Sequence, residues 1–331
     1  MRRYGVLCVV LLLIMVVTPL LAMGEAPAGG TSSPEARSDG QAVAGPEGEE
    51  GVMKVLRASS NRVETMSDLD YVIGAVSAEM PATYHTEALK AQAAACYTFA
   101  VRSRQEQLQE PDEALAGAYL NDDSAQHQGF ISKEESREKW GDKFDAYYQK
   151  IREACEEVVG KAIVYEGEPI IAAFHAICSG QTESAQTVWG KDIPYLQSVQ
   201  SPGDKLSPDY SSTLSLTQEQ FRTMAEKLDK VSLGEDPAKW FSDLETSESG
   251  TVTSITIGGQ KVTGQQARSA FGLRSACFTL EHKNDRFIFH VSGYGHCVGM
   301  SQYGADYMAR QGSSWEEIIR HYYSGVEIEQ M

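Results

Sequence analysis

The apolar residues of the stretch 71–104 recur at helical spacing, and this pattern predicts two helices joined by a short turn. Pro81 interrupts the first helix, because proline lacks the backbone donor and restricts the residue before it. Ser67, with Asp70 three residues later, can cap the beginning of that helix, and Thr86 can cap the second one. We therefore expect a helix, a proline-containing turn and a second helix in this order.

Strand and helix periodicities alternate along the rest of the chain. Strands are expected at 52–56 and in three hairpins, which pair 161–165 with 170–175, 251–257 with 260–262, and 276–282 with 286–292. Further helices are expected at 142–159, about 218–229, 264–271 and 315–323, the last one capped by Ser313 and Glu316. The predicted fold class is α+β, with a helical N-terminal half packed on a mostly antiparallel sheet.

The N-terminal residues predict a compartment. Arg2 and Arg3 precede an uncharged apolar run of about the length that crosses a bilayer, and basic residues before such a run place the rest of the chain outside. We expect residues 1–23 to be a retained membrane anchor, with a cleaved signal peptide ending near residue 24 as the alternative. Residues 24–51 lack apolar periodicity and are expected to be a disordered linker, followed by one catalytic domain over 52–331.

Composition and charge exclude some partners. The 331-residue chain carries a formal net charge of −17, which argues against nucleic acid and anionic lipid surfaces but not against a glycan. The chain has no Cys-x-x-Cys pair and no His-Glu-x-x-His motif, so we expect no metal and no cofactor. The loop 121–128 contains Asp and His residues, for which a solvated loop is the simpler interpretation.

One carboxylate, Glu79, falls where the first predicted helix must stop. The apolar residues Met80, Tyr84 and Leu89 lie close to it in sequence and would favour the protonated acid that a general acid requires. A surface glutamate at a frayed helix end is the alternative interpretation.

Two other stretches carry candidate chemistry. The strand ending at His175 continues into Cys178 and Ser179, which would be nucleophiles in a hydrolase, although the surroundings are not Gly-x-Ser-x-Gly. A substrate-lining or turn role is the alternative. The stretch 293–304 holds four glycines among polar and aromatic residues, which indicates a loop whose backbone approaches a ligand closely.

The motifs in these stretches resemble those of the stage II sporulation protein D family. The resemblance rests on YVIG, AEMP and EALKAQA in the stretch 71–93, on His175 with GQTE, VWG and PYL in 175–196, and on GH and VGMSQYGA in 295–305. It extends in order from about residue 53 to residue 328. Three long motifs together are a specific signal.

The resemblance implies a peptidoglycan lytic transglycosylase. Such an enzyme cleaves peptide-stripped glycan strands between N-acetylmuramic acid and N-acetylglucosamine and leaves 1,6-anhydro ends. The catalytic acid/base of the family maps onto Glu79, and one carboxylate is enough where ordinary glycosidases need two. The residues then expected to bind sugar hydroxyls and N-acetyl groups or to orient Glu79 are Lys90, Gln92, His175, Thr182, His296, Ser301, Gln302 and Tyr303. For each of them a structural role is the alternative.

The resemblance also implies where the protein acts and with what. The family is similar to single-pass proteins of the mother-cell membrane that face the intermembrane space during endospore engulfment. The implied partners are an amidase resembling stage II sporulation protein P and a membrane protein resembling stage II sporulation protein M. A non-catalytic glycan-binding activator of an amidase is the alternative function, because relatives of this fold are described as amidase enhancers.

This chain departs from the family pattern at two cysteines. Cys178 stands in the middle motif where the family usually has serine, and Cys297 stands in the last motif where it usually has glycine. Our hypothesis is that the two thiols lie close enough to pair, as a disulfide or as free thiols, beside Glu79. The zinc ligands of some clostridial relatives are missing from the loop 121–128, where only His127 remains.

Overall fold

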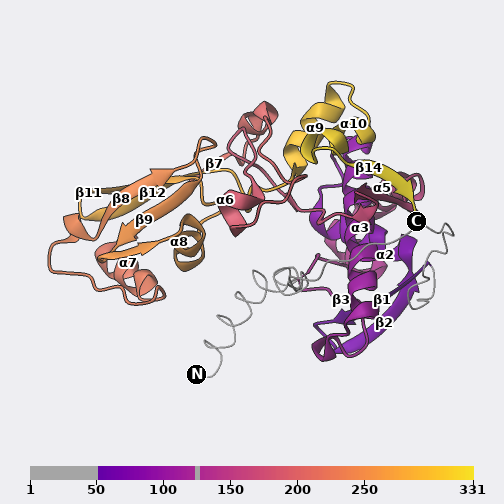
Figure 1. Cartoon of the computed structure of the whole chain (residues 1–331), viewed down its shortest axis with the longest axis horizontal. Helices are drawn as coiled ribbons and strands as arrows, with labels where there is room; N and C mark the ends of the chain where they lie inside the picture. Colours follow the sequence, from indigo (N-terminus) through magenta and orange to yellow (C-terminus); the bar gives the residue numbers. More distant parts are fainter. Residues whose placement is uncertain (1–50, 124–126) are drawn as a thin grey trace, which may run out of the picture. The chain divides into compact units, whose positions relative to one another are not determined.

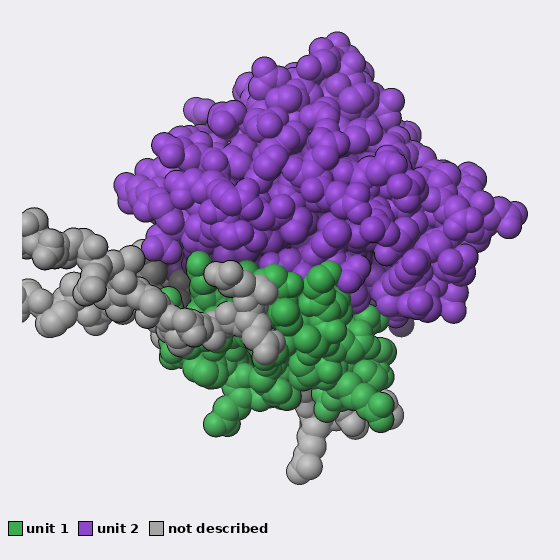
Figure 2. Space-filling model, turned by 90° about the vertical axis from the view of Figure 1, so that its right-hand side faces the viewer, with its two compact units in different colours: residues 1–67, 103–129 green, residues 68–102, 130–331 purple. Residues whose placement is uncertain are grey.

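The computed structural model describes residues 51–123 and 127–331, and the proposed anchor and linker lie outside this range. Within it, no helix is long and apolar enough to cross a bilayer. The described chain divides into two compact units, coloured separately in Figure 2: residues 51–67 with 103–129, and residues 68–102 with 130–331.

The smaller unit contains a three-stranded sheet in the order β2-β1-β3. Its strands are β1 (Val52–Arg57), β2 (Arg62–Ser67) and β3 (Leu120–Asn121), with β1 antiparallel to β2 and parallel to β3. Arg57 is buried and forms an ion pair with Asp122 at 2.8 Å. The strand expected at 52–56 is confirmed.

Helices α2 (Asp68–Glu79), α3 (Thr86–Gln109), α4 (Lys133–Trp140) and α5 (Phe144–Glu156) form the helical part of the larger unit, apart from the end of α3. A Cβ at Gly74 in α2 would overlap the Phe130 ring, so the segment after residue 130 lies directly on this helix. The alanines of α3 are fully buried. The Thr98 hydroxyl links α3 to the strand 161–165 by accepting the N–H of Ile163 at 2.9 Å. Small side chains therefore allow this helix to lie deep in the core.

The larger unit has several small sheets where the sequence predicted one. Its first sheet contains β14 (Glu327–Gln330), β4 (Lys161–Tyr165) and β5 (Glu168–Pro169). Of the expected hairpin partner 170–175, only Ile170 bonds β4, through its N–H to the carbonyl of Ile163 at 3.0 Å. The last two residues form β6 (Phe174–His175), which pairs in parallel with β13 (Met300–Ser301). A pairing partner so far away in sequence is invisible to a local pattern.

Residues 211–292 form a lobe with its own aromatic core. Its strands are β7 (Ser211–Thr217), β8 (Phe241–Thr246), β9 (Val252–Ile257), β10 (Gln260–Val262), β11 (Phe278–Lys283) and β12 (Arg286–Ser292), and its helices are α7 (Gln218–Ala225) and α8 (Gly264–Phe271) (Figure 1). Phe221 lies at its centre, with the Phe287 ring centroid 4.0 Å away. Both hairpins and the helix 264–271 are confirmed as expected, whereas α7 ends four residues before the expected limit.

Helices α6 (Ala185–Trp189), α9 (Gln302–Arg310) and α10 (Trp315–Tyr322) and the 3-10 helix η3 (Pro202–Leu206) complete the larger unit. Helix α10 begins at the expected residue and ends one residue early, but its capping box is formed by Ser314 with Glu317, not by Ser313 with Glu316. The fold is thus mixed α/β with several sheets, most of whose strand pairs are antiparallel.

Candidate active site

Glu79 is the last residue of α2 and is partly buried. A lysine from α4 occupies this helix end: the Lys139 Nζ donates to the carbonyl of Ser77 at 2.8 Å and to that of Ala78 at 3.4 Å. A cation suits the carbonyl end of a helix. Burial lowers the pKa of Lys139, and the nearby Glu79 carboxylate opposes that shift. Glu79 therefore stands in a structured polar setting rather than on a frayed end.

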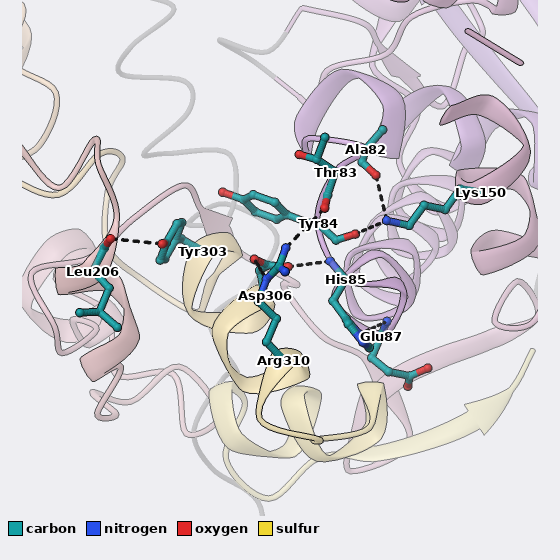
Figure 3. Close-up of polar contacts among 10 residues, drawn as sticks. All are labelled: Ala82, Thr83, Tyr84, His85, Glu87, Lys150, Leu206, Tyr303, Asp306 and Arg310. Carbon is teal, nitrogen blue, oxygen red and sulfur yellow. Dashed lines mark hydrogen bonds and ion pairs between the residues drawn. The ribbon is translucent and has the colours of Figure 1, made fainter. Parts of the chain in front are cut away.

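The turn after Glu79 is tied to two other helices (Figure 3). From α5, the Lys150 Nζ donates to the carbonyl of Ala82 at 3.0 Å and also to that of Tyr84. From α9, the Asp306 carboxylate accepts the backbone N–H of His85 at 2.6 Å. Lys150 thus binds two carbonyls of the turn itself, whereas the carbonyl of Ser77, which Pro81 leaves without a helical N–H partner, is bound by Lys139.

Tyr84 connects the same turn to the last motif. Its ring meets the Tyr303 ring edge-to-face, with centroids 6.2 Å apart, and the Tyr303 hydroxyl donates to the carbonyl of Leu206 at 3.3 Å (Figure 3). Burial raises the pKa of Tyr84 to about 12, and the nearby Asp306 carboxylate adds to that shift. The phenol is therefore neutral at physiological pH.

His175 and His296 form a neutral pair. Their ring centroids are 5.7 Å apart. The Trp189 ring also contacts His296, with the two ring centroids 5.7 Å apart. Burial lowers the pKa of His175 to about 3 and that of His296 to about 4. Neither ring is a cation at neutral pH, so both act as hydrogen-bonding groups.

The tautomer of each ring follows from its backbone partner. The Nδ1 of His175 lies 3.1 Å from the carbonyl of Val298, which can only accept, so Nδ1 carries the proton. The Nε2 of His175 is buried and has no partner among the described residues. It thus presents an acceptor lone pair. The Nδ1 of His296 accepts the N–H of Val298 at 3.1 Å, which places its proton on Nε2.

The glycine-rich loop lies against the strand end that carries His175. A Cβ at Gly295, whose φ is 119°, would stand 2.7 Å from the Cβ of His175, and one at Gly299 would overlap the carbonyl of Ala173. Glycine is required where two backbones approach so closely. Cys297 has a φ of 67°, a region that glycine adopts without strain, so a cysteine at this position carries some backbone cost.

Asp204 joins the middle and last motifs, and the sequence analysis did not single it out. Its side chain is fully buried and accepts the N–H of Cys178 at 3.2 Å, the thiol of Cys178 at 3.2 Å, and the hydroxyl of Ser301 at 2.5 Å. It also accepts the hydroxyl of Ser201. Burial raises the pKa of Asp204, and these hydrogen bonds oppose the shift. The signal in the sequence was only an aspartate in a Pro-Gly loop.

Several predicted ligand-binding residues are engaged within the protein. Gln92 and Gln302 are buried and bonded to each other at 3.3 Å, and the Thr182 hydroxyl accepts the N–H of Val199 at 2.9 Å. The Lys90 ammonium forms ion pairs with Glu87 at 2.9 Å and Glu157 at 2.6 Å.

His175, His296, Ser301 and Tyr303 are brought together: Ser301 lies opposite His175 in the β13–β6 pair, and the Tyr303 N–H bonds the carbonyl of Ala176 at 3.1 Å. Ser301 itself is buried and caps α9, whereas Tyr303 and His296 are only partly buried. The partly buried rings are the better placed to meet a ligand.

The hydrolase alternative has no base. The Ser179 hydroxyl donates to the carbonyl of Ser249 at 2.6 Å, and the Cys178 thiol donates to Asp204. Burial raises the pKa of Cys178 further, which holds it as a neutral thiol. Neither group has the histidine partner that nucleophilic catalysis needs.

Cys178 and Cys297 do lie in one buried cluster, as hypothesised, but Cys277 is its third member. None of the three forms a disulfide, so the disulfide form of the hypothesis is not what the structure holds. Cys297 is hydrogen-bonded to Cys277 rather than to Cys178. This bond lowers the pKa of Cys277 to about 7. Among the described residues, no three His, Cys, Asp or Glu side chains gather as metal ligands do.

Comparison with known proteins agrees with this arrangement of motifs. Residues 57–165 match the family model described as "Stage II sporulation protein". A Bacillus subtilis (strain 168) protein named stage II sporulation protein D is 36% identical over 98% of this chain and 94% of its own length. Its Bacillus amyloliquefaciens counterpart is 38% identical over 83% of this chain and 77% of its own length. A third relative, named "Amidase enhancer", from Bacillus subtilis (strain 168), is 24% identical over 77% of this chain and 40% of its own length.

These matches first define the class of the protein, which is a sporulation protein. Within that class it belongs to the stage II sporulation protein D family, as its three motifs indicated.

Proposed function

We propose that this protein is a peptidoglycan lytic transglycosylase whose single acid/base is Glu79. The observation that carries the proposal is the setting of Glu79: it ends a helix, it is partly buried, and the turn that follows it is bonded to α9, whose first turn adjoins His175. A bridging element of this kind can hold one proton donor beside a polar aromatic site.

The other buried carboxylates of this region are engaged. Asp204 accepts four hydrogen bonds, Glu183 accepts the N–H of Ser184 and two serine hydroxyls, and Asp306 holds His85 and Arg310. Because these bonds already hold all three side chains, none of them is a ready second acid or nucleophile, and a mechanism with one acid/base is the simpler one.

In the proposed reaction, the Glu79 carboxyl protonates the glycosidic oxygen as the bond to C1 of N-acetylmuramic acid breaks. The resulting carboxylate then takes the proton of the C6 hydroxyl of the same sugar, and that oxygen forms the new bond to C1. The proton is returned to Glu79, and no water is consumed. The product is a strand ending in a 1,6-anhydro sugar.

The partly buried rings suit the substrate better than the charged residues do. His296, Trp189 and Tyr303 offer aromatic faces with polar edges, which match sugar rings. His175 supplies an acceptor through its Nε2. The net charge of −17 suits a strand stripped of its acidic stem peptides better than it suits an anionic polymer.

The remaining parts of the proposal follow from family resemblance. We propose that the chain acts on peptide-stripped strands after an amidase resembling stage II sporulation protein P, together with a membrane protein resembling stage II sporulation protein M. Residues 1–23 would anchor it to the mother-cell membrane, with the described part facing the intermembrane space during engulfment.

The decisive experiment compares the full chain with its Glu79→Gln variant on purified peptide-free glycan strands. Anhydro ends are counted by mass spectrometry, and we expect at least about a hundredfold loss, as for removal of a general acid. Glu138→Gln, which changes an exposed glutamate of α4, is the matched control and should keep full activity. A Glu79→Gln protein that still makes anhydro ends would refute the assignment.

A second candidate function is supported by the relative named "Amidase enhancer": a glycan-binding activator of a peptidoglycan amidase. It is tested with the same variant. If the chain acts only as an activator, Glu79→Gln stimulates a purified amidase on intact peptidoglycan as well as the unmodified chain does, and neither protein produces anhydro ends.

A further inference from the structure

Asp306 has an unusual pair of partners. Its side chain is buried, one carboxylate oxygen accepts the N–H of His85 at 2.6 Å, and the other accepts the Arg310 Nε at 2.7 Å (Figure 3). The Arg310 guanidinium also reaches the carbonyl of Thr83 at 3.4 Å. Asp306 and its ion-pair partner Arg310, both in α9, thus bind two backbone groups of the turn that begins after Glu79.

A second ion pair in the same unit shows that an i,i+4 ion pair in a helix does not by itself bind a distant backbone segment. Arg152 and Glu156 in α5 have the same i,i+4 separation and the same 2.7 Å distance, but both side chains are largely exposed. The structure records no bond from this pair to another segment among the described residues. Surface pairs of that kind contribute little to stability. The Asp306 pair differs because a distant backbone segment depends on it.

The other end of α9 is equally fixed. Its cap, Ser301, donates to Asp204, which also binds the N–H of Cys178, and the Tyr303 N–H bonds the carbonyl of Ala176. The residues on either side of these contacts carry His175 and the glycine-rich loop. Helix α9 is therefore one rigid piece with the histidine pair at its beginning and the turn after Glu79 near its end.

We propose that Asp306 is the positioning residue for Glu79, which rests on the function proposed above. By binding His85 directly and Thr83 through Arg310, it fixes the turn 80–85 on α9 and so sets the place of the acid relative to the histidine pair. Asp306 touches no substrate in this account. A displacement of about 1 Å at a reacting group is enough to cost a large factor in rate.

The test compares Asp306→Ala, Asp306→Asn and the control Glu156→Ala in the full chain. Three quantities are measured: kcat and KM on peptide-free glycan strands, amide hydrogen exchange of residues 80–86, and the unfolding midpoint. We expect Asp306→Ala to lower kcat at least about tenfold while KM changes less than about threefold, and to speed exchange in 80–86. Glu156→Ala should change none of these.

The conservative variant supplies a rescue. The Asp306→Asn amide oxygen can still accept the His85 N–H, so its kcat should fall between those of the unmodified chain and Asp306→Ala. If Asp306→Ala does not fold, Arg310→Gln replaces it: this exposed side chain can be changed without opening the core, and the change frees Thr83 alone. Arg310→Gln also removes the ion pair with Asp306 but leaves the His85 bond, so it should speed exchange in 80–86 and lower kcat with KM unchanged.

The proposal is overturned if exchange in 80–86 and kcat stay as in the control, or if the loss of activity equals the unfolded fraction at the assay temperature. It fails independently of the proposed function when Glu79→Gln is inactive and Asp306→Ala is fully active. If the unmodified chain makes no anhydro ends, the proposed function fails instead, and the exchange data alone decide whether Asp306 holds the turn.

Discussion

Replacing Asp204 should destabilise the larger unit through the donors it leaves behind. The carboxylate is fully buried and accepts four hydrogen bonds from Cys178, Ser201 and Ser301. In Asp204→Ala the Ser201 hydroxyl keeps a partner in the Tyr322 hydroxyl, which lies 2.7 Å away. The backbone N–H of Cys178 cannot turn. It would be left buried without a partner.

The magnitude follows from these contacts. An orphaned buried donor costs about 1–3 kcal/mol, and each lost hydrogen bond to a charged acceptor costs about 1.5–3 kcal/mol. Relief from burying the carboxylate offsets part of this loss. We expect a net decrease of about 3 kcal/mol in the free energy of unfolding, or a fall of roughly 8 °C in Tm for a unit of this size.

The assay is chemical denaturation of Asp204→Ala, Asp204→Asn and Asp209→Ala, with calorimetry for Tm. Asp204→Asn keeps an acceptor, and its amide can donate to Ser201, so it should lose only about 1 kcal/mol. Asp209, five residues along, is largely exposed and meets only Arg274 at 3.4 Å, so its replacement should cost less than about 0.5 kcal/mol. The reasoning is refuted if Asp204→Ala costs under about 1 kcal/mol or if asparagine is as damaging as alanine.

Three further outcomes are expected. Gly304→Ala should cost more than about 2 kcal/mol in denaturation because its Cβ would overlap two hydroxyls, whereas Gly234→Ala, with open space around it, should fold normally; equal stability would contradict this. The folded-state pKa values of His175 (about 3) and His296 (about 4) lie below the ordinary value of 6.5, so the unfolded chain binds these protons first and stability is lost as pH falls below 6.5. At pH 5 this loss amounts to about 2 kcal/mol of unfolding free energy for each ring. His296→Asn should therefore lose less unfolding free energy than the unmodified chain between pH 7 and pH 5, and equal losses would count against the neutral pair. Cys277 should be alkylated only after unfolding, because it is 4% exposed, and rapid labelling of the folded protein in mass mapping would show that the thiol cluster is open.

Local signals predicted the elements that local interactions build. The helix 264–271 and the hairpin of 251–257 with 260–262 were predicted from neighbouring residues. The structure shows the local contacts behind them: Thr263 with Gln266 forms the capping box of α8, and the glycine pair after β9 turns the chain into β10. The parallel pairing of β6 with β13 joins residues more than 100 positions apart, and no local pattern reports it. The single expected sheet became several for this reason.

The motifs indicated which stretches carry the candidate site, but not how its residues are connected. The family resemblance selected Gln92 and Gln302 as ligand-binding residues, yet the fold brings them face to face in the core, where they satisfy each other. Asp204 and Asp306 were overlooked because an aspartate shows its importance only through the distant donors it meets. Buried polar groups need such partners, so these positions become visible once the fold is known.

The lobe of residues 211–292 leaves and rejoins the rest of the chain at one place, since Ser211 and Ser292 are partners across the β7–β12 ladder. Because the two ends of this segment lie side by side, the segment can be lengthened, shortened or exchanged without moving the residues that flank it. Insertions in the turn between β11 and β12, such as between Asn284 and Asp285, should accordingly be tolerated. A reporter peptide or a crosslinking tag could be inserted there while the histidine pair and the turn after Glu79 keep their geometry.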